Sequence, residues 1–168
     1  MRHQISIVQE GFDKVTCWSQ SRIGTKDDLY ILNTQKLKLA GSDVYGLVHS
    51  CYSNDRGKTW SKLVPQNNLR VEGGSIADTT PKYHEKTGKF LMLGQRILYQ
   101  DDKALIPELN AVGRSYYSVY DMESMSWKVA KVPIGIDGEP LSNTFFGCIQ
   151  RCDLENGDIL IPMSRRND

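Results

Sequence analysis

Several features that would narrow the range of possible functions are missing from this sequence. No apolar run approaches the ~18 residues of a membrane-spanning helix, and residues 1–9 are too polar and too short for the apolar centre of a signal peptide. Neither sign of charge dominates, because 21 Lys and Arg face 20 Asp and Glu, which gives a formal net charge of +1. We therefore expect a soluble chain without a membrane span or a nucleic-acid partner. Its compartment, whether cytosolic, secreted or periplasmic, stays open.

Cysteine is scarce, and its spacing suggests neither disulfides nor zinc. The four cysteines are too few and too scattered for a disulfide framework, and none forms a C-x-x-C pair. We expect buried free thiols, the usual state of unpaired cysteine, at Cys17, Cys51, Cys148 and Cys152. Neither a metal nor an organic cofactor is predicted, and the redox compartment stays open.

A helical period is missing as well. No segment keeps a 3.6-residue period across three turns, and the best helical candidate, 102–113, is interrupted by Pro107. Short apolar stretches instead alternate and are bounded by Gly, Asn, Asp or Pro. These strand candidates are Gln35–Gly41, Val44–Tyr52, Lys89–Gly94, Tyr116–Tyr120 and Asp158–Pro162. The sequence predicts one all-β domain over residues 1–168, built from short strands joined by hairpins.

A weak internal repeat accompanies these strands. Trp60 and Trp127 each end a similar two-strand unit, 67 positions apart, and residues 152–162 form a third hairpin. The spacing exceeds the ~40–50 residues of common repeats of this kind, which predicts an inserted loop at about 98–113.

The most distinctive segment is "SNDRGKTW", residues 53–60. An Asp at a turn, here Asp55, accepts hydrogen bonds from nearby backbone N–H groups. Gly57 can take the positive φ of a tight hairpin, Thr59 is expected to start the next strand, and Trp60 supplies a large apolar body for packing. The octet predicts an exposed hairpin with a largely buried tryptophan and a structural role.

The octet resembles the Asp-box, S-x-D-x-G-x-T-W, of sialidases and related BNR-repeat β-propellers. All of its fixed positions are filled, by Ser53, Asp55, Gly57, Thr59 and Trp60. The resemblance implies the N-terminal portion of a six-bladed propeller, with about two and a half blades of four-stranded antiparallel sheet in this chain. The box would join the third and fourth strands of a blade, away from the active site. Residues 120–127, "YDMESMSW", keep only the tryptophan and look like a degenerate box.

Three further residues acquire candidate roles from this resemblance. "QSRIG" is similar to the F/Y-R-I-P motif of sialidases, with Arg22 at the arginine that grips a substrate carboxylate and Gly24 in place of the proline. A planar guanidinium suits that role, although a surface-turn arginine in a salt bridge is the alternative. Asp43 matches the loop Asp that acts as general acid and base, or is simply part of a polar turn. Asp78 could line a pocket at the mouth of the second blade, or simply start a strand.

The histidines give weaker signals. His84 and Glu85 lie in a polar hairpin where solvation is expected, and their spacing provides no metal site. His49 lies on the strand before the octet and is interpreted as a hydrogen-bonded core residue.

The function that the resemblance implies is exo-glycosidase activity of the sialidase (neuraminidase) type. Such a hydrolase releases a terminal acidic sugar, sialic acid or a similar one, from a glycoconjugate, using a Tyr nucleophile rather than two carboxylates. That Tyr, its Glu and two more arginines would lie outside these residues, so this chain alone is expected to be inactive. A non-catalytic Asp-box propeller that binds glycan or protein, and a hydrolase or lyase of another sugar, are the alternatives. Open sheet edges would be covered by the rest of the protein or by another chain.

Overall fold

The computed structural model describes residues 5, 7–41, 43–101, 103–104, 115–141, 144–146 and 149–165. Within these ranges the chain consists of antiparallel strands and one short 3-10 helix, with no α-helix. This confirms the all-β prediction. Most of the helical candidate 102–113 and of the expected insertion lies outside the described residues. Across the same ranges, no helix has the length and apolar character needed to cross a membrane.

The first sheet is a four-stranded antiparallel meander in chain order. It consists of β1 (Thr16–Lys26), β2 (Leu29–Lys38), β3 (Tyr45–Ser53) and β4 (Val64–Pro65). The short 3-10 helix η1 (Asn67–Leu69) follows it. Two of the strand candidates match β2 and β3 in part, but β2 starts earlier and ends at Lys38, and β1 was not among the candidates.

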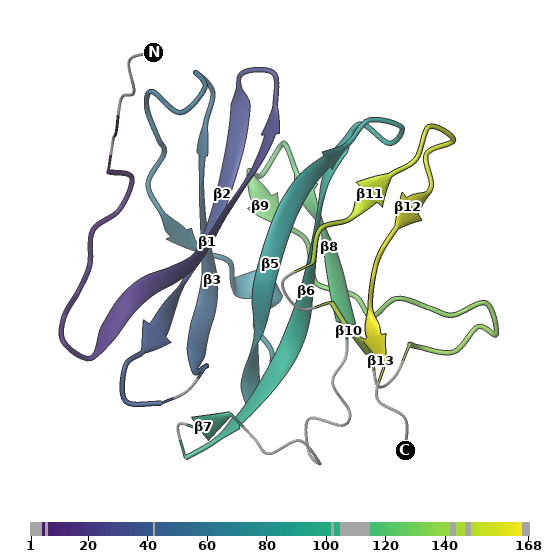
Figure 1. Ribbon diagram of the computed structural model, residues 1–168. Helices are drawn as coiled ribbons and strands as arrows, with labels where there is room; N and C mark the ends of the chain where they lie inside the picture. The colour runs from purple at the N-terminus through teal and green to yellow at the C-terminus, as the bar shows by residue number, and fades with distance from the viewer. Residues whose placement is uncertain are drawn as a thin grey trace.

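The second sheet repeats the same meander. Its strands are β5 (Gly74–His84), β6 (Lys89–Gln100), β8 (Ser115–Asp121) and β9 (Ser126–Trp127), and β7 (Lys103–Ala104) pairs with the end of β6. Figure 1 shows the two sheets following one another from left to right, with their first hairpins at the same end.

A shared irregularity links the two sheets. Each first strand carries a β-bulge at the same place in its hairpin, over 19–22 in β1 and over 77–80 in β5. The first bulged residue is Gln20 in one sheet and Asp78 in the other, and both have positive φ, 55° and 58°. Since a bulge redirects the side chains of its strand, the two sheets re-aim corresponding residues.

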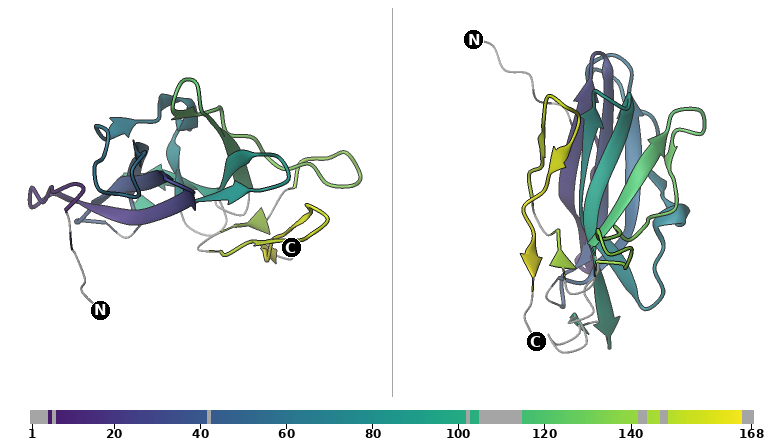
Figure 2. Two further views of the ribbon diagram at one scale, coloured as in Figure 1. Left: turned by 90° about the horizontal axis from the view of Figure 1, so that it is seen from above. Right: turned by 90° about the vertical axis from the view of Figure 1, so that its right-hand side faces the viewer.

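The C-terminal segment starts a third unit. In it β10 (Thr144–Phe145) pairs with β13 (Ser164–Arg165), and β11 (Cys152–Asp153) pairs with β12 (Ile159–Leu160). Both views of Figure 2 place β1 and this segment on one side of the molecule, and the later strands β3, β8 and β9 on the other. The first strands of successive units therefore face a common side.

The core lies between the first two sheets and is anchored by Trp127. This side chain is 0% exposed, and its Nε1–H donates to Asn33 Oδ1 at 2.9 Å and to Ser50 Oγ at 3.2 Å, both in the first sheet. The ring also packs edge to face against Tyr120, with centroids 5.0 Å apart. Apolar neighbours complete this cluster, namely Ile31, Val48, Leu69, Ile76, Phe90 and Met92.

The third unit is fastened to the second sheet by Arg151 and His84. The buried guanidinium of Arg151 donates from Nη2 to the carbonyl oxygens of Lys82 and Tyr83, at 3.0 and 3.3 Å. His84 Nε2 lies 3.0 Å from the carbonyl oxygen of Gly157. His84 is only 4% exposed, so the expectation of a solvated histidine was wrong. The contact with the third hairpin buries it.

Candidate functional site

The octet 53–60 closes on itself through its own side chains. Ser53 Oγ donates to Asp55 Oδ1 at 2.7 Å and accepts the N–H of Gly57 at 2.8 Å. The N–H and the hydroxyl of Thr59 donate to the two carboxylate oxygens of Asp55, at 2.9 and 2.7 Å. These hydrogen bonds, led by the Thr59 N–H, lower the pKa of Asp55 to about 2. The polar residues of the octet thus stabilise its own turn.

Two details of the octet differ from the sequence prediction. Gly57 does take a positive φ, 82°, but Thr59 starts no strand, because β4 begins only at Val64. Trp60 is only partly buried, and its Nε1–H donates to the Gly57 carbonyl at 3.1 Å. It was expected to be largely buried; in the structure the fully buried tryptophan is Trp127.

Arg22 and Asp78 form an ion pair between the first strands of the two sheets. Nη2 of Arg22 donates to Asp78 Oδ1 at 3.3 Å and to Gln20 Oε1 at 2.7 Å, while Gln95 Nε2 donates to Asp78 Oδ2 at 2.8 Å. The side chain of Arg22 is 28% exposed and that of Asp78 is 7% exposed. Arg22 forms the salt bridge of the alternative interpretation, but it lies within β1 and not on a surface turn. Asp78 lies at a bulge in the middle of β5 and not at the start of the strand.

Asp43 is connected to Arg22 through two intervening side chains. Asp43 is exposed in the loop before β3, and the Tyr45 hydroxyl donates to its Oδ1 at 3.0 Å. Gln20 Nε2 in turn donates to the Tyr45 hydroxyl oxygen at 3.1 Å, and the carbonyl of the same amide accepts from Arg22. The two main candidates of the sequence analysis thus belong to one hydrogen-bonded network.

The second sheet holds Tyr45 in place from the other side. The main-chain N–H of Tyr45 donates to the Tyr99 hydroxyl at 3.0 Å, and Ser75 Oγ lies 2.8 Å from the same hydroxyl. Burial raises the pKa of both phenols above its ordinary value, and the hydrogen bond to Asp43 adds to the rise for Tyr45. Both tyrosines are therefore protonated, and the hydroxyl of Tyr45 donates, near neutral pH.

Three of the eight non-glycine residues with positive φ in the described ranges belong to this network. Gln20, Asp43 and Asp78 have φ of 55°, 58° and 58°, a left-handed region that non-glycine residues seldom occupy. Such strain persists only where surrounding contacts enforce it, and it is typical of functional sites. That three strained residues share one hydrogen-bond network makes it the leading candidate site.

Sequence reasoning missed five members of the network, Gln20, Tyr45, Ser75, Gln95 and Tyr99. Gln20 stands at the start of the "QSRIG" motif and Tyr45 two positions after Asp43, so their neighbours were noted but they were not. No local pattern could reveal their role, because it depends on which strands pair and where they bulge.

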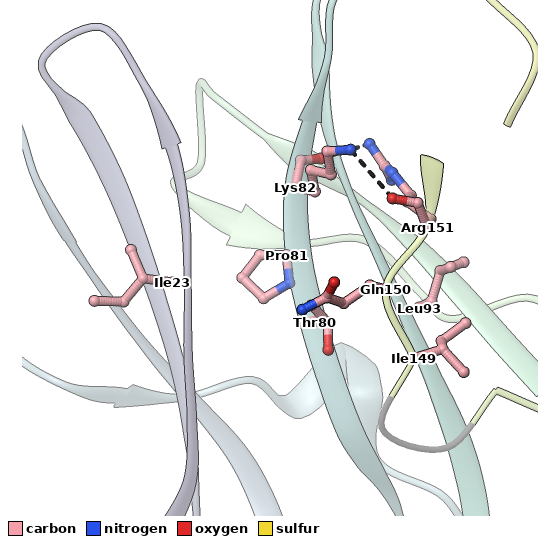
Figure 3. A pocket seen from close by; sticks show the side chains of 8 residues that line it. All are labelled: Ile23, Thr80, Pro81, Lys82, Leu93, Ile149, Gln150 and Arg151. Carbon is pink, nitrogen blue, oxygen red and sulfur yellow. Dashed lines mark hydrogen bonds between the residues drawn. The ribbon is translucent and has the colours of Figure 1, made fainter. Parts of the chain in front are cut away.

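A separate cavity of about 280 Å³ lies between β1, β5 and the third unit (Figure 3). Its two polypeptide walls are joined by hydrogen bonds between Lys82 and Arg151, at 3.0 and 3.3 Å. Neither Arg22 nor Asp43 lines it. The lining residues are Ile23, Thr80, Pro81, Lys82, Leu93, Ile149, Gln150 and Arg151.

The cysteines and His49 take no part in the network's hydrogen bonds described above. His49 is half-buried, with Nδ1 2.9 Å from the Leu47 carbonyl oxygen, in agreement with a hydrogen-bonded residue. Burial raises the pKa of the Cys51 thiol to about 11, whereas Cys152 is exposed, contrary to expectation, and Cys17 is partly buried. Cys148 lies outside the described residues. In the part of the chain that is described, no group of three His, Cys, Asp or Glu could hold a metal ion.

Comparison with known proteins does not assign a family. A scan of the sequence against protein-family models gives no match, and a search of curated proteins gives no similar sequence.

Proposed function

We propose that this chain is the N-terminal part of a six-bladed, sialidase-like β-propeller that acts on the terminal acidic sugar of a glycoconjugate. In this proposal Arg22 binds the sugar carboxylate and Asp43 transfers the proton, while this chain alone lacks the nucleophile. The observation that carries the proposal is the link from Arg22 to Asp43 through Gln20 and Tyr45.

The arrangement of the sheets supports the proposal. Two four-stranded meanders follow one another, and their first strands face the same side as the start of a third unit. Blades of a propeller are arranged in this way around an axis. The octet 53–60 begins at Ser53, the last residue of β3, whereas Asp43 precedes the start of the strand. Because β3 is nine residues long, the octet lies at the opposite end of this strand from Asp43, which suits a structural role.

The ion pair between Arg22 and Asp78 favours a second candidate, a non-catalytic propeller that binds glycan or protein. A guanidinium already paired with a carboxylate attracts an incoming anion less strongly. On the other hand, Asp78 holds the guanidinium through Nη2, and the side chain stays 28% exposed. A fixed, partly exposed arginine is well suited to recognising a carboxylate.

A binding experiment separates the two candidates. N-acetylneuraminic acid and its methyl ester, which has lost the carboxylate charge, are titrated into the chain and followed by NMR. We expect the acid to bind and the ester to bind roughly tenfold more weakly, because a charge-assisted hydrogen bond is lost. Arg22→Lys keeps the charge but loses the planar fork, so it should reduce the preference for the acid.

Arg70→Lys, at an exposed arginine beside η1, is the matched control and should keep the preference. Equal binding of the acid and the ester, or no binding of either, would contradict the role of Arg22. Binding of uncharged glycans with no preference for the acid would favour the non-catalytic candidate.

A further inference from the structure

The connection between Arg22 and Asp43 has a fixed direction. The guanidinium can only donate, so the Gln20 group 2.7 Å from it must be the carbonyl oxygen. This orients the amide so that its N–H donates to the Tyr45 hydroxyl oxygen, at 3.1 Å. The hydroxyl proton of Tyr45 is then directed to the Asp43 carboxylate, at 3.0 Å. Every link donates toward Asp43.

Such a chain transmits changes of charge along its length. Hydrogen bonds in series polarise one another, and each link strengthens when the donor before it is more strongly polarised. A carboxylate that binds the guanidinium of Arg22 partly neutralises the positive charge of the guanidinium. The hydrogen bond that Arg22 donates to Gln20 then becomes weaker. That change continues through Tyr45 to the hydrogen bond that Asp43 receives.

We propose that Gln20 and Tyr45 are positioning residues that couple Arg22 to Asp43, so that occupancy of the arginine by a carboxylate changes the hydrogen bond at Asp43. In a glycosidase of the proposed kind, the hydrogen bond to the proton-transferring residue would then differ between the free and the substrate-bound protein. The identity of the ligand rests on the proposed function, whereas the relay itself does not.

Several charged or titratable groups surround the Tyr45 phenol and bear on any test by pH. Asp43 faces it from the loop before β3, Asp78 lies across on β5, and Tyr99 on β6 accepts the Tyr45 main-chain N–H. Arg22 on β1 reaches it through the Gln20 amide. After burial, the Gln20 donor, which lowers the pKa of Tyr45, and the Asp43 acceptor, which raises it, have the largest effects.

These opposite influences define the first test. The chain is labelled with ¹³C at the ζ position of tyrosine, and the Tyr45 signal is identified as the one lost in Tyr45→Phe. Asp43→Asn should move the titration midpoint of Tyr45 to lower pH, because the protonated phenol loses its anionic acceptor. Gln20→Leu, of similar size, should move it to higher pH, because the phenolate loses a donor. Gln9→Leu, whose amide contacts its neighbour Glu10, is the control and should leave the midpoint in place.

A second test at neutral pH avoids alkaline unfolding. Saturating N-acetylneuraminic acid should shift the Tyr45 ζ-carbon signal in the unmodified chain, and Gln20→Leu should abolish that shift while the sugar still binds. Midpoints that stay in place or move in the same direction in both variants, or a response to the sugar that persists in Gln20→Leu, would overturn the relay. Opposite midpoint shifts with no sugar binding would keep the relay and reject the proposed ligand.

Discussion

Because of Asp55, the stability contributed by the octet 53–60 depends on pH in the acid range. Its folded-state pKa, about 2, lies below the ordinary value of 3.8 because the Thr59 N–H and the side chains of Thr59 and Ser53 donate to the carboxylate. A lowered pKa means that the unfolded chain takes up the proton first. The stabilising contribution of Asp55 is therefore complete above about pH 4 and disappears as the pH falls toward 2.

We therefore expect Asp55→Asn to lower the melting temperature by a few degrees at pH 7 and by much less near pH 2. Thermal unfolding followed by circular dichroism between pH 2 and 7 measures this difference. Asp158→Asn, at an exposed residue of the third hairpin, is the control. A difference between Asp55→Asn and the unmodified chain that stays constant across this range would refute the assignment.

Gly24 shows how a departure from a motif can have a local physical cause. A Cβ atom at this position would lie 2.8 Å from the Pro81 carbonyl oxygen and 2.9 Å from its carbon. These distances are shorter than atoms normally tolerate, so β1 can approach β5 here only with glycine. The proline of the F/Y-R-I-P motif would meet the same crowding. The substitution was visible in the sequence, but its cause lay in the contact between two sheets.

Among the strands, β1 shows why part of the fold and much of the site could not be predicted. Strand patterns are recognised by alternation with a period of two, and the bulge at 19–22 interrupts that period. β8 has no such interruption within the predicted segment and was anticipated in part. β3 was also anticipated in part, although its pairing with β2 shifts register between Tyr45 and Val48. The bulge that interrupts the alternating pattern of β1 also places Gln20 beside Tyr45.

The contact of β9 with the first sheet leads to a prediction about the two tryptophans. Trp127→Phe removes the buried indole N–H that donates to Asn33 Oδ1, which keeps only the Ser50 hydroxyl as a donor, and losing a buried hydrogen bond costs about 0.5–1.5 kcal/mol. Trp60→Phe removes a hydrogen bond at a partly exposed site, where water can replace it. We expect the first change to reduce the free energy of unfolding in urea clearly more than the second. Equal losses would contradict this prediction.

For the whole molecule, the exposed apolar side chains of the third unit bear on association. Leu160 is 61% exposed on β12, in the β11–β12 sheet, and Met163 is 44% exposed beside β13, in the β10–β13 sheet; the strands of both sheets are very short in the described ranges. Exposed apolar residues near a sheet edge favour pairing with another chain. We expect the 168-residue chain to self-associate as its concentration rises, as measured by light scattering.

The double variant Leu160→Lys with Met163→Lys should weaken this association, because charge near an edge opposes pairing. Val129→Lys removes an equally exposed apolar side chain, 64% exposed, outside the third unit and serves as the control. A monodisperse monomer at all concentrations would contradict the prediction.

The hydrogen bond between Trp127 and Asn33 joins residues 94 positions apart, and it therefore constrains the order of folding. The hairpins of the first sheet are local and can form while the rest of the chain is still being synthesised. Their buried amide, however, gains its indole partner only after residue 127 has been added. The earliest hairpins to form should thus be among the last to gain full protection against hydrogen exchange.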